Sequence, residues 1–168
     1  MEVTKSNCSN NILLTQRKYT LELLEKTAML DCKPSPTLVS SGTRVSLHAG
    51  ELLPNPSDYR SIICALQYLT LTRPDITFVV NFASQFLHAP TYEHMILVKR
   101  ILRFVKSSLG YGITIRSGDI TTISGYSDSD WDGYPDSRRS TSGYCVFVVS
   151  TLVSWQSKKQ PTVSQSST

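Results

Sequence analysis

The middle of the chain repeats its apolar residues with the period of an α-helix. Between residues 57 and 107, apolar side chains recur three or four positions apart and predict three consecutive helices. Ser57 begins the first helix. Pro74, in the first turn of the second, and Thr91, at the start of the third, are residue types favoured at helix beginnings. Because the links between these helices are short, we expect them to pack against one another.

The pattern before residue 57 is less regular. Thr15 is a suitable N-cap for a helix that reaches Leu30, with its apolar residues on one face. Residues 33–56 contain repeated Pro and Gly and predict an irregular connector, a strap laid over a surface or a former hinge. Residues 1–12 are polar and are predicted to be loose.

After Gly110 the apolar period changes from that of a helix to that of a strand. Tyr111, Ile113 and Ile115 alternate with small or polar residues and predict a strand. Three further strands are predicted at residues 120–126, 144–149 and 152–155. The sequence therefore predicts an α+β fold, with a helical bundle followed by an antiparallel β meander.

Composition narrows the class of protein. Of the 168 residues, 40% are hydrophobic, and no apolar run approaches the roughly 18 residues of a membrane span. The N-terminus has no apolar signal core, so we expect a soluble intracellular protein without a membrane partner, and the compartment, nucleus or mitochondrion, stays open. The four cysteines form no CxxC pair, and Cys64 and Cys145 are predicted to be buried thiols. No nucleotide-binding glycine motif or catalytic triad is present, and no small-molecule substrate is predicted.

An acidic group follows the second predicted strand of the meander. Asp128, Asp130 and Asp132 stand at alternate positions. Strand alternation places Asp128 and Asp130 on one side, and clustered carboxylates are the hard oxygen ligands that hold Mg²⁺. A solvated acidic turn is the alternative. The spacing does not fit a calcium-binding EF-hand, because Arg139 stands where the loop needs glutamate.

Positive charge is concentrated in the second half of the chain. Residues 91–168 carry nine Lys and Arg against six Asp and Glu, a net charge of +3, whereas residues 1–90 carry +1. Lys99, Arg103 and Lys106 are spaced to line one outward face of the third predicted helix. Such a stripe can meet a phosphate backbone, although an ordinary solvated helix face has the same appearance.

Two basic pairs flank the predicted strands of the meander. They are Arg138 with Arg139, and Lys158 with Lys159. We expect the pairs to lie near each other, and guanidinium forks suit phosphates. The predicted partner is therefore a nucleic acid, bound weakly and without sequence preference.

Several blocks carry a specific resemblance. From about residue 14 to the end, the chain resembles the Pol polyprotein of Copia-type (Ty1/copia) retrotransposons, and it is similar to open reading frames of plant mitochondria that derive from such elements. The blocks are YRSI at 59–62, ALQYLT at 65–70, TRPDI at 72–76, residues 98–106, YSDSDW at 126–131, residues 138–145 and residues 154–168.

The resemblance implies a division of the chain. Residues 13–107 correspond to the thumb and connection helices at the end of reverse transcriptase, and residues 111–168 to the start of an RNase H-like domain. Asp128 matches the first catalytic carboxylate and Mg²⁺ ligand of that domain. The candidate nucleic-acid contacts remain Lys99, Arg103, Lys106, Arg138, Arg139 and Lys158. The resemblance implies that their partner is an RNA–DNA hybrid or DNA.

The resemblance also implies what is missing. The polymerase signature, a tyrosine followed by paired aspartates, is absent, and the later RNase H carboxylates would lie beyond Thr168. We therefore expect a truncated domain with an incomplete metal site that binds no cofactor alone and is not an enzyme. The alternatives are an RNase H that cleaves RNA–DNA hybrids once other segments complete it, and a domesticated nucleic-acid-binding module.

Overall fold

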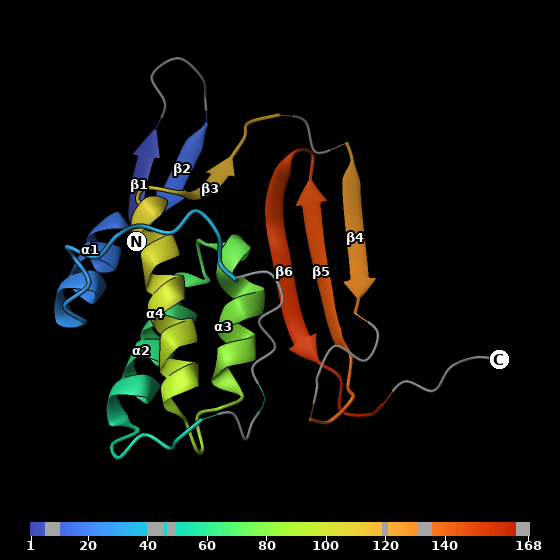
Figure 1. Cartoon of the computed structure of the whole chain (residues 1–168). Coiled ribbons are helices and arrows are strands. Elements are labelled where there is room, and N and C mark those ends of the chain that lie inside the picture. Colours follow the sequence, from blue (N-terminus) through green and yellow to red (C-terminus); the bar gives the residue numbers. More distant parts are fainter. Residues whose placement is uncertain (6–10, 40–45, 47–49, 119–120, 131–135, 164–168) are drawn as a thin grey trace.

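Four α-helices and one short 3-10 helix build the core of the protein (Figure 1). The computed structural model describes residues 1–5, 11–39, 46, 50–118, 121–130 and 136–163. The helices are α1 (Arg17–Lys26), α2 (Ser57–Leu69), η1 (Pro74–Ile76), α3 (Thr77–Ser84) and α4 (Tyr92–Ser107). The three helices predicted between residues 57 and 107 are confirmed, because their apolar stripes face one shared core.

The first helix is shorter than its sequence pattern predicts. Thr15 is the last residue of a strand, and Gln16 occupies the N-cap position instead. The helix ends at Lys26, because Ala28 adopts a left-handed backbone conformation with φ of 53°. The predicted start at Thr15 is wrong because pairing with neighbouring strands takes precedence over the local capping preference.

A three-stranded antiparallel sheet joins the two ends of the helical region. Its strands are β1 (Glu2–Lys5), β2 (Ile12–Thr15) and β3 (Gly112–Ile115), in the order β1-β2-β3. The prediction that residues 1–12 are loose is therefore wrong for the described part of that segment. The strand predicted around residues 111–115 is present, but it pairs with β2 and not with the meander.

The second sheet is the predicted meander. It consists of β4 (Ile123–Ser129), β5 (Thr141–Val148) and β6 (Thr151–Lys159), antiparallel and in the order β4-β5-β6. The strand β6 lies against α3, where the Asn81 side-chain amide donates a hydrogen bond to the main-chain carbonyl of Ser157. In Figure 1, β4 is the strand farthest from the helices.

The described parts of the connector contain no helix or strand, as predicted, and they lie along α4. Near the C-terminal end of that helix, the Ser35 N–H donates to the Arg103 carbonyl. Near its N-terminal end, the Tyr92 N–H donates to the Glu51 carbonyl and Leu52 forms an isolated β-bridge with Thr91. The connector is therefore a strap over the outer side of α4.

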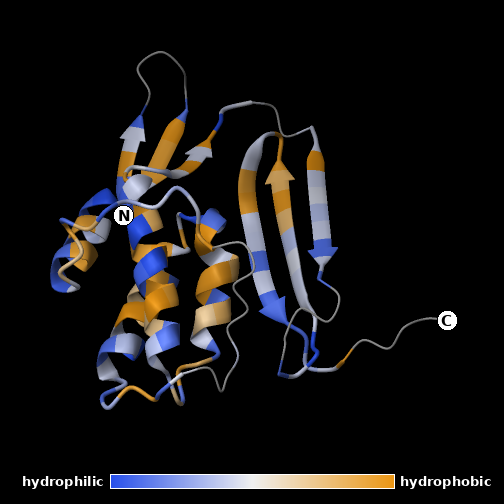
Figure 2. Cartoon of the chain, viewed as in Figure 1, coloured by the Kyte–Doolittle hydropathy of each residue, from blue (hydrophilic) through white to orange (hydrophobic). Residues whose placement is uncertain are grey.

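The apolar core belongs to the helices. The cluster of buried apolar side chains draws on α1, α2, α3 and α4 but on none of the described residues of β4, β5 or β6. Figure 2 shows apolar colouring on the helices and along β5, whereas β4 is mostly pale. No helix in the described part of the chain is long and apolar enough to span a membrane.

Candidate nucleic-acid interface

Asp128 lies near the end of the outer strand β4 and is exposed. In the sheet it stands opposite Gly143 of β5, which in turn stands opposite Ser157 of β6. The Asp128 carboxylate accepts a hydrogen bond of 2.8 Å from the main-chain N–H of Ser129. Its position at a strand end, open to solvent, allows it to contact a ligand.

Asp130 makes different contacts. Its main-chain N–H donates to the Thr141 carbonyl at 3.1 Å, and its carboxylate accepts from the Thr141 N–H. It therefore helps to hold the start of β5. Asp132 lies outside the described residues. Among the residues that the structure describes, no three His, Cys, Asp or Glu side chains gather as a metal site, and Mg²⁺ binding by Asp128 stays a prediction.

The two basic pairs converge at the same end of the sheet as Asp128. Lys158 is exposed and stands opposite Ser142, and Lys159 stands opposite Thr141. Burial lowers the pKa of Lys159, and the positive charge of Arg139 lowers it further, against an opposing effect of Asp136. The expected proximity of the pairs is thus confirmed for Arg139 and Lys159. Arg138, the residue before Arg139, has a left-handed backbone conformation with φ of 51°.

The basic stripe predicted on α4 is only partly open. Lys99 is exposed, whereas Arg103 and Lys106 are half-buried. The Lys106 ammonium donates to the Cys32 carbonyl at 2.6 Å, and the strap also contacts the Arg103 carbonyl through Ser35. The prediction that all three cations face outward is therefore wrong for Lys106, because the chain at Cys32 packs against the C-terminal half of the helix.

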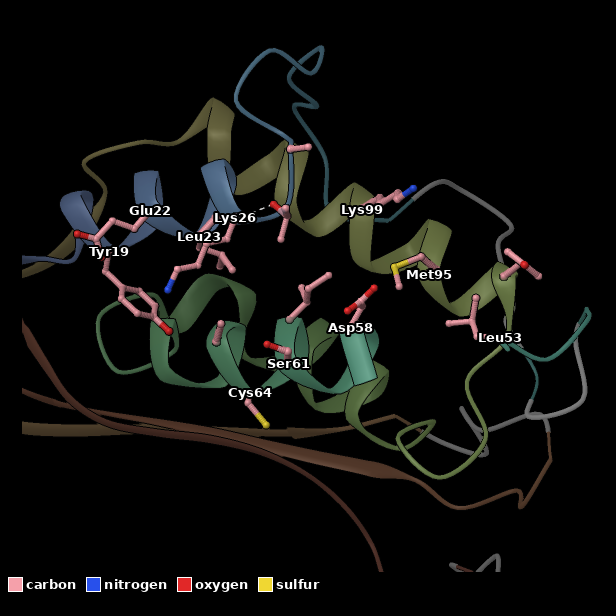
Figure 3. A pocket seen from close by; sticks show the side chains of 15 residues that line it. Tyr19, Glu22, Leu23, Lys26, Leu53, Asp58, Ser61, Cys64, Met95 and Lys99 are labelled. Carbon is pink, nitrogen blue, oxygen red and sulfur yellow. Dashed lines mark hydrogen bonds between the residues drawn. The ribbon is translucent and has the colours of Figure 1, made fainter. Parts of the chain in front are cut away.

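Lys99 instead borders a groove between α1, α2 and α4 (Figure 3). The groove has a volume of about 790 Å³, and its charged side chains have both signs: Glu22, Lys26, Asp58 and Lys99. Cys64 also borders it and is exposed, which corrects the prediction of a buried thiol; Cys145 is half-buried. Mixed charge does not favour a polyanion in this groove.

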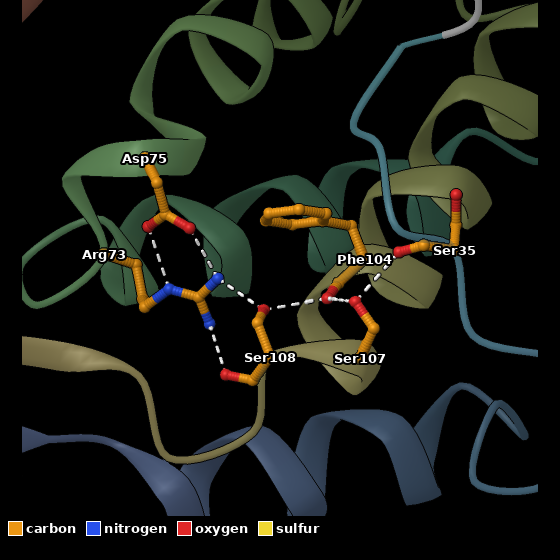
Figure 4. A network of polar contacts seen from close by, with 6 residues as sticks. All are labelled: Ser35, Arg73, Asp75, Phe104, Ser107 and Ser108. Atoms are coloured by element: carbon orange, nitrogen blue, oxygen red, sulfur yellow. Dashed lines mark hydrogen bonds and ion pairs between the residues drawn. The ribbon is translucent and has the colours of Figure 1, made fainter.

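The TRPDI block has a structural role that sequence reasoning missed. The Arg73 guanidinium, only 3% exposed, donates two hydrogen bonds to the Asp75 carboxylate at 2.6 and 2.9 Å (Figure 4). It also donates to the carbonyl and hydroxyl oxygens of Ser108, at 3.2 and 2.6 Å. The fork therefore ties the start of η1 to the end of α4. The sequence itself shows only an arginine next to a proline, which does not reveal that the arginine is buried.

His94 is a second buried polar residue without a predicted role. It is completely buried and stacks on Phe86 with ring centroids 3.8 Å apart. Its Nδ1 accepts from the Thr91 N–H, and its Nε2 lies 3.1 Å from the Ser46 carbonyl, which fits a neutral ring protonated at Nε2. Burial lowers the pKa of His94, against opposing effects of the Ser46 carbonyl, Asp136 and Glu93.

Comparison with known proteins places the chain among retroelement proteins. It is 44% identical over 159 residues to an uncharacterized mitochondrial protein of Arabidopsis thaliana, covering 95% of this chain and 66% of that protein. It is 44% identical to the retrovirus-related Pol polyprotein from transposon RE2 of the same plant, covering 92% of this chain and 11% of the polyprotein. The retrovirus-related Pol polyprotein from transposon TNT 1-94 of Nicotiana tabacum is 32% identical over the whole chain, which spans 13% of it.

No family model matches the chain, and no solved structure matches it. The relatives nevertheless confirm the resemblance suggested by the sequence blocks. The chain belongs to the family formed by the Pol polyproteins of Ty1/copia-type retrotransposons and the plant mitochondrial proteins derived from such elements.

Proposed function

We propose that this chain is the part of Pol in which reverse transcriptase ends and an RNase H-like sheet begins, and that alone it binds nucleic acid without cleaving it. Under this proposal residues 13–107 are the thumb and connection helices, and the RNase H-like region starts at residue 111. An α+β fold with a helical bundle ahead of an antiparallel meander supports this division.

One observation carries the binding part of the proposal. Asp128, Arg139, Lys158 and Lys159 come from β4, the approach to β5 and the end of β6, yet the strand register brings them to one end of one sheet. A phosphodiester can meet these cations there. The strap over α4 leaves Lys99 as the open cation of the predicted helical stripe, so we assign binding mainly to the sheet.

The absence of cleavage follows from the number and position of the carboxylates. Hydrolysis by two metal ions needs ligands from several chain segments, which hold both ions about 4 Å apart around the phosphate. In the described residues this end of the sheet offers Asp128, Asp130 and Asp136. The Asp130 carboxylate already accepts from the Thr141 N–H, and the Asp136 carboxylate accepts from the Ser46 hydroxyl. These neighbours on one segment cannot surround two ions from opposite sides.

A cleavage assay tests this part directly. The pure chain is incubated with an RNA–DNA hybrid and Mg²⁺ or Mn²⁺, beside the Asp128→Asn variant. We expect no hybrid-specific RNA cleavage from either protein. Cleavage by the unchanged chain that disappears in Asp128→Asn would refute the proposal and make Asp128 a working catalytic residue.

The exposed Asp128 also favours a second candidate function. A longer Pol protein could supply further carboxylates around Asp128 and so complete an RNase H that acts on RNA–DNA hybrids with Mg²⁺. In that setting Asp128→Asn would abolish cleavage by the longer protein. The same assay on a longer Pol segment therefore separates the two functions.

A further inference from the structure

The two faces of the β4-β5-β6 sheet differ in their chemistry. Residues opposite each other in an antiparallel sheet point to the same side, and successive residues alternate. Asp128 shares one face with Tyr126 and Phe147, whose rings meet edge to face. The opposite face, which we name the serine face, includes Ser127, Ser129, Ser142, Tyr144, Ser154, Gln156 and Lys158.

The serine face carries donors and a cation but no carboxylate. Lys158 supplies the positive charge, Gln156 an amide and the serines hydroxyl groups. The hydroxyl oxygens of Ser142 and Ser129 lie 2.7 and 3.4 Å from the Gln160 side-chain amide. Hydroxyl, amide and ammonium donors of this kind contact phosphate oxygens in nucleic-acid complexes.

An exposed aromatic ring completes the face. Tyr144 is 42% exposed and stands between Ser127 and Gln156 in the strand register. Its hydroxyl lies 3.5 Å from the Ser154 hydroxyl, which places both polar groups on this face. An exposed ring on a face that also carries a cation suits an unpaired base, because stacking needs a free base surface.

We propose that a single-stranded nucleic acid crosses the serine face, with its phosphates at Lys158 and the hydroxyl groups and a base stacked on Tyr144. The inference rests on the proposed function, since it names the face and the form of nucleic acid that the sheet binds. The Asp128 face is less suited to the strand, because its carboxylate repels phosphates. A duplex offers Tyr144 no free base surface, so we expect it to bind more weakly than the single strand.

A matched pair of tyrosines provides the first test. Tyr144→Ser removes the ring from the serine face, and Tyr126→Ser removes an exposed ring, 65% accessible, from the Asp128 face. Fluorescence anisotropy with a labelled single-stranded oligonucleotide gives both affinities. We expect Tyr144→Ser to weaken binding about tenfold and Tyr126→Ser to leave it within about twofold.

A matched pair of glutamines provides a second test that barely alters shape. Gln156→Glu places a carboxylate on the serine face, whereas Gln67→Glu makes the same change at an exposed position of α2. We expect only Gln156→Glu to weaken binding of the oligonucleotide, by about tenfold or less at low salt. The thermal unfolding midpoints of the variants should be equal, so that differences in affinity do not reflect differences in stability.

The outcomes separate this inference from the proposed function. Binding that is insensitive to Tyr144→Ser and Gln156→Glu but weakened by Tyr126→Ser would overturn the serine face and leave nucleic-acid binding intact. A preference for an RNA–DNA duplex over the single strand would also overturn it. No binding of any nucleic acid by the unchanged chain would refute the proposed function itself.

Discussion

Arg73 shows how a residue in a family block can serve the fold. The blocks that revealed the resemblance suggested function, yet Arg73 touches Asp75 and Ser108 and lies near the rings of Phe104 and Tyr111 at 5.8 and 5.7 Å. A sequence pattern marks such a residue but does not disclose its partners, since Ser108 is 35 positions away. Arg73 therefore contributes to the stability of the fold.

The first prediction concerns this fork. Arg73→Lys retains the charge but loses the planar fork that bonds Asp75 and Ser108 together, so we expect the free energy of unfolding to fall by about 2 kcal/mol. Urea unfolding measures the change. Arg17→Lys, on the exposed side of α1, is the matched control and should stay within about 0.5 kcal/mol. Equal effects of the two substitutions would contradict this role for the fork.

The second prediction concerns His94 and pH. Its folded pKa lies below the ordinary value of 6.5, so the unfolded chain binds the proton more readily than the folded chain. The stability that neutral His94 contributes is therefore complete above pH 6.5 and is lost as pH falls from there toward the folded pKa. Urea unfolding at pH 7.5 and pH 5.5 should show lower stability at pH 5.5.

The control is His94→Gln, which keeps an amide at the capping-box position but cannot titrate. Other groups also titrate in both proteins. The quantity to compare is therefore the change in the free energy of unfolding between pH 7.5 and pH 5.5, measured for the unchanged chain and for the variant. We expect the loss of stability between pH 7.5 and pH 5.5 to be smaller in the variant. An unchanged loss would show that His94 is not the titrating group.

At the scale of elements, sequence patterns predicted those helices and strands whose contacts join residues near each other in the chain. The helices between residues 57 and 107 and the meander follow from periodicity, and their turns and caps are near in sequence. The β1-β2-β3 sheet could not be predicted in this way, because the whole helical region separates β2 from β3 and each of these strands has four residues. The path of the strap over α4 is likewise a long-range property.

The third prediction tests the pairing of β2 with β3. A Cβ added at Gly112 would collide with the main-chain carbonyl oxygen of Leu14, so the two strands cannot stay paired unchanged. We expect Gly112→Ala to lower the free energy of unfolding by about 2 kcal/mol or more. Gly125→Ala in β4 meets nothing within 4 Å and should cost less than about 1 kcal/mol. Thermal or urea unfolding that ranked them the other way would contradict the observed register.

At the scale of the whole molecule, the buried apolar core and the candidate interface lie in different parts. The buried apolar cluster is helical, whereas the β4-β5-β6 sheet carries the candidate interface and adds nothing to that cluster among its described residues. The sequence pointed to Asp128 and to the basic pairs, because recognisable blocks contain them. It could not show that the Lys106 ammonium bonds to the Cys32 carbonyl, since that depends on tertiary packing.

The fourth prediction follows from this division. Regions with few buried apolar contacts open more easily than a packed core. We expect amide protons of β4 and β5 to exchange with deuterium at least tenfold faster than those of α2 and the middle of α4. Hydrogen exchange followed by mass spectrometry measures this. Equal protection throughout would indicate one cooperative unit and would contradict the account.

The central claim is that one end of the β4-β5-β6 sheet binds nucleic acid through its cations, and a salt titration of binding tests it most directly. Anisotropy of a labelled oligonucleotide is measured between low and moderate salt for the unchanged chain and for a triple charge reversal, Arg138→Glu, Arg139→Glu and Lys158→Glu. A reversal of Lys5, Arg17 and Lys18, all exposed and outside this sheet, is the matched control.

We predict weak binding whose affinity falls with salt as counterions are released. The triple reversal at the sheet should remove most of the binding and lower the salt slope by about 2, the value for three contacts with a single strand. The control reversal should retain the slope. No binding at low salt, or binding that the sheet reversal leaves unchanged while the control reversal abolishes it, would contradict the account.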